Sequence, residues 1–214
     1  MRLDYARAWE AEANEDEIEF EGEYAFHRSF SIEVGVPYAF VAPDAGETRS
    51  GFDNVEVALK FANFAFENHG LLLGYGLGFG LPTGDSASGI GSDRIWELEP
   101  FLSVGWRRGS FELVGWGRFG IPTNLEAGDD VDTELRYDIS VLHHWSRRVQ
   151  ALVELNGETS LGAPAPGDGV LSISPGLKVA PLAGRPLFVG VAGSFPPGDE
   201  ELDARVRFSL FYHF

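Results

Sequence analysis

The side chains best suited to chemistry in this sequence are carboxylates that recur at every second position. Between Glu17 and Glu23 four glutamates alternate with other residues, and no basic residue stands between them. The preceding stretch adds Asp4 and Glu10 rather than a positive partner. Carboxylates held this close together attract cations, or they must be neutralised by bases from elsewhere in the fold. This segment is therefore the first candidate for a cation-binding or cation-conducting surface.

Two other groups of chemistry-bearing residues are weaker candidates. His143 and His144 are adjacent, so in a strand they face opposite ways and cannot chelate one metal together. A Ser–His enzyme would need a hydroxyl beside His143, and Ser140 falls on the opposite face. The acidic loop at 126–132 has oxygen ligands for Ca²⁺ but not the spacing of an EF-hand, so a solvated loop is favoured. We expect no metal, no cofactor and no catalytic residue.

The composition narrows the class of protein. The 214 residues include 33 acidic and 16 basic ones, a net charge of -17 that argues against nucleic acid as a partner. There is no cysteine, which excludes disulfides and thiolate sites. The 27 glycines and 13% aromatic residues favour an all-β chain. No apolar run is long enough for a transmembrane helix, and the first residues lack the apolar core of a signal peptide. We expect a form whose signal has been removed.

Strict alternation of apolar and polar residues indicates the elements that position the carboxylates. It runs through "EIEFEGEYAF", "FSIEVGVPYAF", "NVEVALKFA", "LLLGYGLGFGL", "WELEPFLSVGW", "ELRYDISVLHHW", "VQALVELN", "VLSISPGLKVA" and "RVRFSLFYHF". The less regular "RLDYARAWE" and "FELVGWGRFGI" are also assigned as strands. The pattern predicts about twelve strands of about ten residues and no sustained helix. Pro37, Pro100 and Pro175 fall inside strands, so bulges or kinks are expected there.

The connections alternate between short basic turns and long acidic loops. The short set is "HRS", "ENHG", "RRGS", "SRR" and "PLAGR". The long set centres on "EANEDE", "APDAGETRSG", "PTGDSASGIGSD", "PTNLEAGDDVDT", "SLGAPAPGDG" and "PPGDEELD". Short turns at one end and long loops at the other are typical of an up-and-down antiparallel β-barrel. The whole chain, residues 1–214, is predicted to be one such domain.

The direction of the two faces decides between a soluble and a transmembrane barrel. Strands of about ten residues match a tilted crossing of the hydrocarbon layer, whereas soluble strands are usually shorter. The apolar face is bulky on nearly every strand and carries aromatics near its ends, such as Trp9, Trp96 and Trp106. A soluble, lipocalin-like barrel would enclose a large apolar cavity instead. The apolar face is therefore predicted to point outward to lipid.

The polar face then lines the interior and supplies the candidate site. Its predicted pore-lining residues are Glu19, Glu21, Glu23, Glu33, Glu56, Lys60, Glu97, Glu99, Arg118, Arg136, Lys178, Arg205 and Arg207. One interpretation, which the sequence favours, is a network of salt bridges that fills a narrow barrel. The other is a cation-preferring pore lined by unpaired carboxylates, with Glu17 to Glu23 as its best candidates.

Four alternating glycines, Gly74, Gly76, Gly78 and Gly80, leave part of one inner wall bare. Either they allow a bend or a neighbouring aromatic ring to lie flat, or they widen a path or admit an inward-folded loop. The sequence does not rank these alternatives.

The end of the chain resembles the C-terminal signature of bacterial outer-membrane proteins, a last strand that ends in Phe. Phe208, Leu210, Tyr212 and Phe214 share the apolar face of this strand. The resemblance implies that they are read by the barrel assembly machinery.

A second resemblance rests on "GFDNVEVALKFAN", "LLLGYGLGFGLPTGD" and "ELEPFLSVGW". These are similar to the transporter-like barrels associated with the MetA pathway of phenol degradation, with Pro82 to Asp85 matching the end of a glycine-alternating strand. Asp53–Asn54 departs from the Gly-Asp usual in that family. The resemblance covers residues 15–214, is specific only at about 51–125, and implies a barrel with a role in transport.

Together these patterns predict a Gram-negative outer-membrane barrel for passive passage or binding of a small solute through a narrow, carboxylate-rich lumen. The solute is not identified. The alternatives left open are a closed structural barrel and a lipid-modifying outer-membrane enzyme, although an enzyme is not expected. Both termini and the basic turns are expected at the periplasm. The expected partners are outer-membrane lipid, lipopolysaccharide and the barrel assembly machinery.

Overall fold

The computed structural model describes the chain except for residues 11–12, 127–130, 163–168, 183, 198–201 and 214. The described residues form thirteen strands and one 3-10 turn, η1 (Glu67–His69). The strands are β1 (Arg2–Glu10), β2 (Ala13–His27), β3 (Phe30–Pro43), β4 (Arg49–Phe52), β5 (Glu56–Asn63), β6 (Leu71–Gly80), β7 (Trp96–Arg108), β8 (Phe111–Thr123), β9 (Glu134–His144), β10 (Val149–Ser160), β11 (Gly169–Val179), β12 (Leu187–Ser194) and β13 (Leu202–Tyr212). No helix among the described residues is long and apolar enough to cross a membrane.

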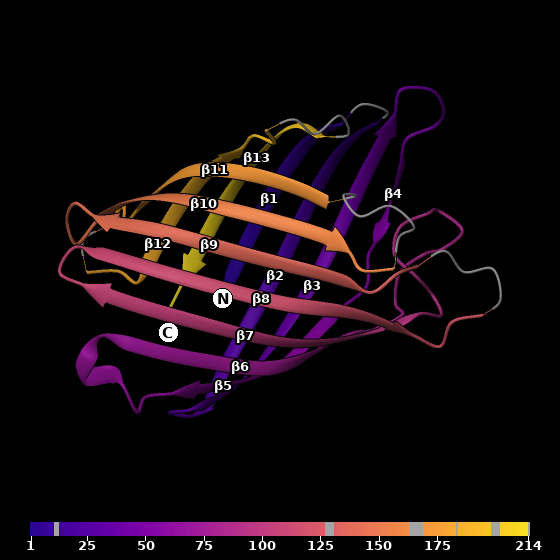
Figure 1. Cartoon of the computed structure of the whole chain (residues 1–214). Helices are drawn as coiled ribbons and strands as arrows, with labels where there is room; N and C mark the ends of the chain where they lie inside the picture. Colours follow the sequence, from indigo (N-terminus) through magenta and orange to yellow (C-terminus); the bar gives the residue numbers. More distant parts are fainter. Residues whose placement is uncertain (11–12, 127–130, 163–168, 183, 198–201, 214) are drawn as a thin grey trace.

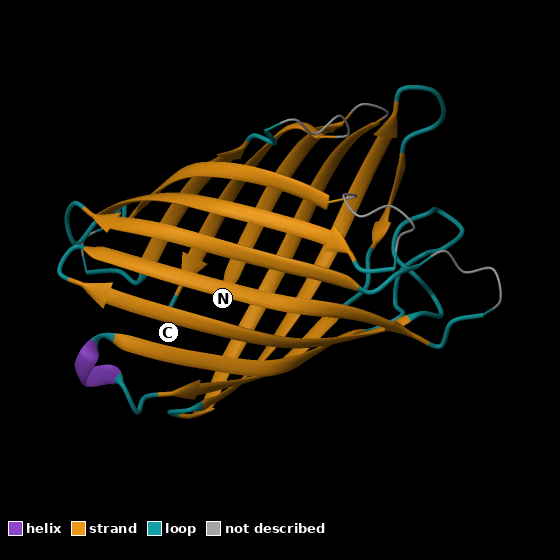
Figure 2. Ribbon diagram, in the orientation of Figure 1, coloured by secondary structure: helices purple, strands orange, loops and turns teal. Residues whose placement is uncertain are grey.

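The strands close into one antiparallel barrel (Figures 1 and 2). The sheet runs in the order β2, β1, β13 and on down to β5 and β3, and the pairing of β2 with β3 completes the ring. The short β4 pairs with residues 38–41 of β3, and the longer β5 pairs with residues 30–35 of the same strand. Together β4 and β5 therefore occupy a single strand position in the ring. The barrel is therefore the predicted twelve-stranded up-and-down barrel, which is confirmed.

The break between β4 and β5 lies opposite Pro37. Tyr38 of β3 pairs with Phe52, whereas Gly35 pairs with Glu56, so two residues of β3 face three on the other side. The Pro37 carbonyl accepts a hydrogen bond from the Asp53 N–H at 3.1 Å. Proline has no backbone N–H, so it cannot donate a hydrogen bond to this neighbouring segment in return. The ladder therefore forms a bulge at the position where Pro37 cannot donate a hydrogen bond.

The other two strand prolines also interrupt ladders, but neither shows the predicted bulge, because each ladder keeps its register across the proline. The β7–β8 ladder omits Pro100 and resumes at Phe101 in the same register. The β11–β12 ladder begins only after Pro175, with an isolated bridge at Ile173 beyond it.

One predicted loop is wrong. The first long loop was placed at residues 12–17, but β2 begins at Ala13, so only residues 11–12 connect β1 to β2. Asn14 and Asp16 fall on the outer face and Glu15 and Glu17 on the inner face, so no apolar alternation marks this part of the strand. Both termini lie at the short-turn end, as expected, and the Met1 amino group donates to the Tyr212 carbonyl at 3.1 Å.

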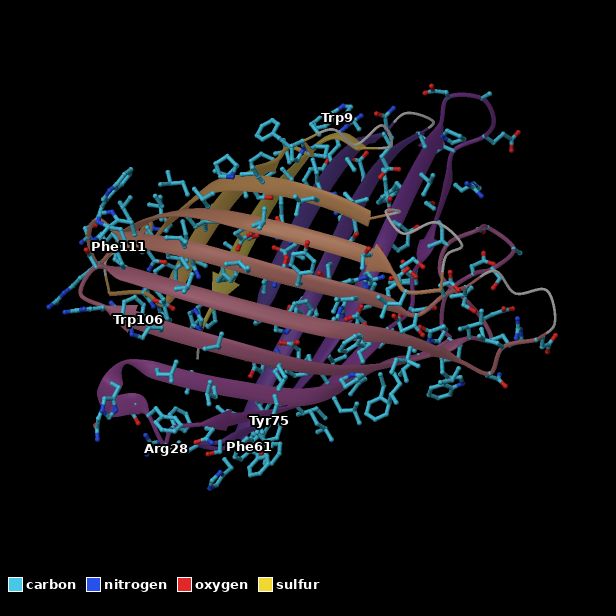
Figure 3. The ribbon with its side chains drawn as sticks, in the orientation of Figure 1. Trp9, Arg28, Phe61, Tyr75, Trp106 and Phe111 are labelled. Carbon is cyan, nitrogen blue, oxygen red and sulfur yellow. The ribbon has the colours of Figure 1, made fainter. Side chains whose placement is uncertain are left out.

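The apolar face points outward, as predicted. Phe20, Leu59 and Leu102 are exposed, and no bulky apolar side chain among the described residues is fully buried. In the strands and their ends, the buried residues other than glycine are instead small or polar: Asp4, Ala6, Ala8, Ser31, Ala39, Glu99, Ser140, Ser172, Ser174 and Ala180. Ile90, in the loop between β6 and β7, is a buried apolar exception. In Figure 3 the labelled Phe61 and Tyr75 project from the outside of the ribbon, with their rings 4.7 Å apart. This is the reverse of a soluble barrel.

Candidate functional site

The inner wall carries a cluster of carboxylates contributed by strands far apart in the sequence. Glu19 and Glu21 of β2, Glu33 of β3, Glu56 of β5 and Glu99 of β7 line one small cavity of about 50 Å³. All five were predicted as pore-lining residues, and the barrel closure at β2–β3 brings them together. Because they lie on inward positions of neighbouring strands, their negative charges add at one place in the lumen.

Arg118 neutralises part of this cluster. Its guanidinium lies 2.8 Å from the Glu99 carboxylate and 3.4 Å from that of Glu56, and it stands 5.3 Å from the centre of the Trp116 ring. The Arg118 side chain is 17% exposed and that of Glu99 only 5%. Strand β8 reaches β5 across β6 and β7, so these contacts exist only in the closed barrel.

Two more bases neutralise carboxylates on the same side of the lumen. Lys60 is paired with Glu33 and lies 3.6 Å from Glu23. Arg2 is paired with Asp4 and lies 3.2 Å from Glu21. The view that the first strand offers no positive partner is therefore wrong. The period-two spacing of Arg2 and Asp4 on one face was the signal that could have revealed it.

A separate network surrounds Arg136 on β9. It contacts Glu134 at 2.5 Å and Glu158 of β10 at 3.0 Å. The favoured interpretation, a network of salt bridges, thus describes Glu21, Glu23, Glu33, Glu56 and Glu99 among the predicted residues. It also includes the predicted bases Lys60, Arg118 and Arg136, but not the other five predicted residues.

Several inward charges have no ion pair within the described part of the chain. They include the carboxylates Glu15, Glu17, Glu19 and Glu97 and the bases Lys178, Arg205 and Arg207. Lys178 instead lies 3.8 Å from the centre of the Phe211 ring and 5.1 Å from that of Phe188. The lumen therefore holds free charge of both signs.

The glycine-rich inner surface of β6 is covered rather than bare. The register places Gly74, Gly76, Gly78 and Gly80 opposite inward side chains of β7, and a Cβ at Gly76 would collide with the Phe101 ring. Likewise the Glu99 side chain occupies the space beside Gly78. These glycines allow an aromatic ring and two carboxylates to lie flat on the wall.

The two adjacent histidines contact different side chains. His144 is hydrogen-bonded to Glu112 at 3.0 Å, and the His143 ring packs 4.6 Å from the Phe111 ring. No hydroxyl is hydrogen-bonded to either ring among the residues that the structure describes. Most of the acidic loop considered for Ca²⁺ lies outside the described residues, and its Asp132 accepts from the Ser160 hydroxyl at 3.1 Å.

Asn54, which the sequence marked only as part of a departure from the family pattern, holds the long loop between β6 and β7. Its Oδ1 accepts from the backbone N–H groups of Gly84 at 3.0 Å and Ser92 at 2.9 Å. Within the loop, the Ser88 hydroxyl donates to Asp85 and lowers the pKa of that carboxyl group. The position of Asn54 in the bulge beside Pro37 thus fixes the loop at the end of the barrel opposite the termini.

We expect Asn54→Ala to release this loop. The Ser92 N–H loses its acceptor, which costs about 1–3 kcal/mol locally. Hydrogen exchange at the amides of residues 84–92 should accelerate while the strands stay protected. Asn54→Asp keeps an acceptor oxygen and should preserve the protection. Equal exchange rates in the wild type and in Asn54→Ala would contradict the role of Asn54 in holding the loop.

No family model and no curated protein matches the chain in sequence. Several solved structures match it in fold. The COG4313 outer membrane channel from Pseudomonas putida F1 has a TM-score of 0.75 at 12% identity, over 98% of this chain and 92% of that one. The NanC porin gives 0.68 at 10% identity, over 99% and 100%. The KdgM porin gives 0.64 at 11% identity, over 100% and 99%.

These similarities show that the fold is that of outer-membrane porin-like barrels. The names of these structures do not mention the MetA pathway, so that resemblance stays a prediction. LpxR from Salmonella typhimurium, a lipid-modifying barrel enzyme, is a weaker match with a TM-score of 0.52. The expectation that the chain is not an enzyme also stays a prediction.

Proposed function

We propose that this chain is a bacterial outer-membrane channel that lets small solutes pass passively through a narrow, carboxylate-rich lumen. The observation that carries the proposal is the inverted barrel, with apolar side chains outside and charged side chains inside. A wall of this kind is stable in lipid on one side and water on the other. The channels and porins that share the fold support the same function.

The lumen should prefer cations. Inward carboxylates outnumber inward bases, and Glu17, Glu19 and Glu97 have no ion pair within the described residues. Unpaired carboxylates along a pore raise the local concentration of cations. A closed structural barrel would instead be expected to pair its inward charges.

The other expected partners belong to this proposal. The outward faces of Phe208, Leu210 and Tyr212 on β13 contact outer-membrane lipid and carry the assembly signal. Phe214, the last residue of that signal, lies outside the described residues. The acidic loops face lipopolysaccharide, and the basic turns face the periplasm.

Planar-bilayer recording under a KCl gradient tests the proposal. We expect steady conductance with a reversal potential that favours K⁺. Glu19→Gln removes an unpaired inward charge and should shift the reversal potential toward zero. Glu67→Gln is the matched control, because Glu67 lies outside the strands in the exposed turn η1 and should leave it unchanged.

A folded barrel that stays silent would contradict the channel. Conductance with no shift in Glu19→Gln would instead contradict the role of the unpaired carboxylates.

A further inference from the structure

Arg205 and Arg207 stand on the inner wall of β13 among small residues. Arg207 pairs in register with Ala6 of β1 on one side and Ala192 of β12 on the other. Arg205 pairs in the same way with Ala8 and Ser194. No bulky neighbour on either adjacent strand covers the two guanidinium groups, and Arg207 is exposed within the barrel.

These arginines differ from the other inward ones. Arg2, Arg118 and Arg136 each contact carboxylates, at distances of 3.4 Å or less. Arg205 and Arg207 have no ion pair or hydrogen bond to any residue that the structure describes. Because no described residue is paired with them, the two guanidinium groups are available to an anionic group that enters the lumen.

Unpaired carboxylates lie beside the arginines across one strand. On the other side of β1, Ala6 pairs with Glu17 and Ala8 with Glu15. Two rows therefore run across the three strands: Glu17–Ala6–Arg207 and Glu15–Ala8–Arg205. Neighbouring strands are about 4.8 Å apart, so the acid and the arginine of one row have backbones about 10 Å apart. No ion pair closes this gap among the described residues.

The opposite wall is also acidic. Strand β7, which carries Glu97 and Glu99, is six strands from β13 in either direction around the ring. The lumen therefore has a positive strip at β13 and negative charge both beside and opposite it. Such a field orients a solute whose own charges are separated.

We propose that Arg205 and Arg207 bind the anionic end of a small zwitterionic solute while Glu15 and Glu17 bind its cationic end. This assignment rests on the proposed channel function and names its solute class. The channel then favours a compound with a carboxylate and an ammonium several bonds apart over an uncharged compound of similar size. Orientation by the two charged strips brings the zwitterion through the narrow section in one alignment.

Swelling of proteoliposomes tests the proposal with 4-aminobutyrate as the zwitterion and arabinose as the uncharged probe. The wild type should admit 4-aminobutyrate faster than arabinose. In the double variant Arg205→Gln/Arg207→Gln the 4-aminobutyrate rate should fall roughly fivefold, while the arabinose rate is unchanged. A fivefold change corresponds to the free energy that ion pairs contribute in a hydrated site. Arg205→Lys/Arg207→Lys retains both charges and should keep most of the preference.

The outcomes separate the two proposals. Entry of neither probe into wild-type liposomes would overturn the channel function and this inference with it. Entry of both at equal rates, or an equal fall of both rates in the glutamine variant, would overturn the zwitterion site alone. Arg28→Gln, in an exposed turn between β2 and β3, should change neither rate. A difference in gel migration between unheated and heated samples should show that each variant is folded.

Discussion

Replacing Arg118 by alanine should lower the free energy of unfolding by about 3 kcal/mol, among the largest single effects expected in this protein. The change leaves the Glu99 carboxylate, which is 5% exposed, without its base at 2.8 Å. It also removes the positive charge that separates Glu99 from Glu56. Denaturant unfolding of the barrel in lipid vesicles measures the loss.

An exposed ion pair supplies the matched control. Arg28 contacts Glu67 at 2.5 Å, but the two side chains are 67% and 60% exposed. Arg28→Ala should therefore cost less than about 1 kcal/mol, since water already screens the pair. Equal losses for the two variants would mean that the lumen around Arg118 is as well hydrated as the outer surface, which would contradict the buried network.

Leu59→Arg should destabilise the barrel by about 2–4 kcal/mol in a bilayer, because it places a charge on the lipid face. Leu59 lies on the outward side of β5, and its side chain is 50% exposed in the isolated chain. The measurement is again unfolding in lipid vesicles, where the hydrocarbon layer surrounds this face.

The neighbouring Ala58→Arg tests the same charge on the opposite face. Ala58 lines the cavity of Glu19, Glu33 and Glu56, so a new guanidinium there meets carboxylates instead of lipid. We expect this variant to be close to the wild type in stability and to shift the reversal potential toward anions. If Ala58→Arg were as destabilising as Leu59→Arg, the assignment of inner and outer faces would be wrong.

In the channel proposed above, the pairing of inward charges lets one wall serve both stability and passage. Arg118, Lys60 and Arg2 offset the repulsion within the acidic cluster. Glu19 lies in the same cavity without an ion pair within the described residues, so the proposed channel assigns it to solute and ions. Under this proposal, stability and selectivity rest on different carboxylates of one cluster.

The sequence by itself determined the architecture. Alternation from Ile18 to Phe26 and in the other strands predicts which residues face lipid, because side chains of a strand point to opposite faces at every step. The same rule placed Glu19, Glu56 and Glu99 on the inner wall before any contact was known. It failed at residues 13–17, where both faces are polar and the pattern carries no contrast.

Only the tertiary structure decided which of these charges are paired. Arg118 meets Glu56 although they lie 62 positions apart and three strands apart around the ring. Arg2 meets Glu21 through the β1–β2 register, and Asn54 reaches Gly84 and Ser92 only because a bulge opposite Pro37 places it there. Alternation reports the face of a residue but not its height in the barrel. Ion pairs depend on height, which is set by the stagger of the closed ring.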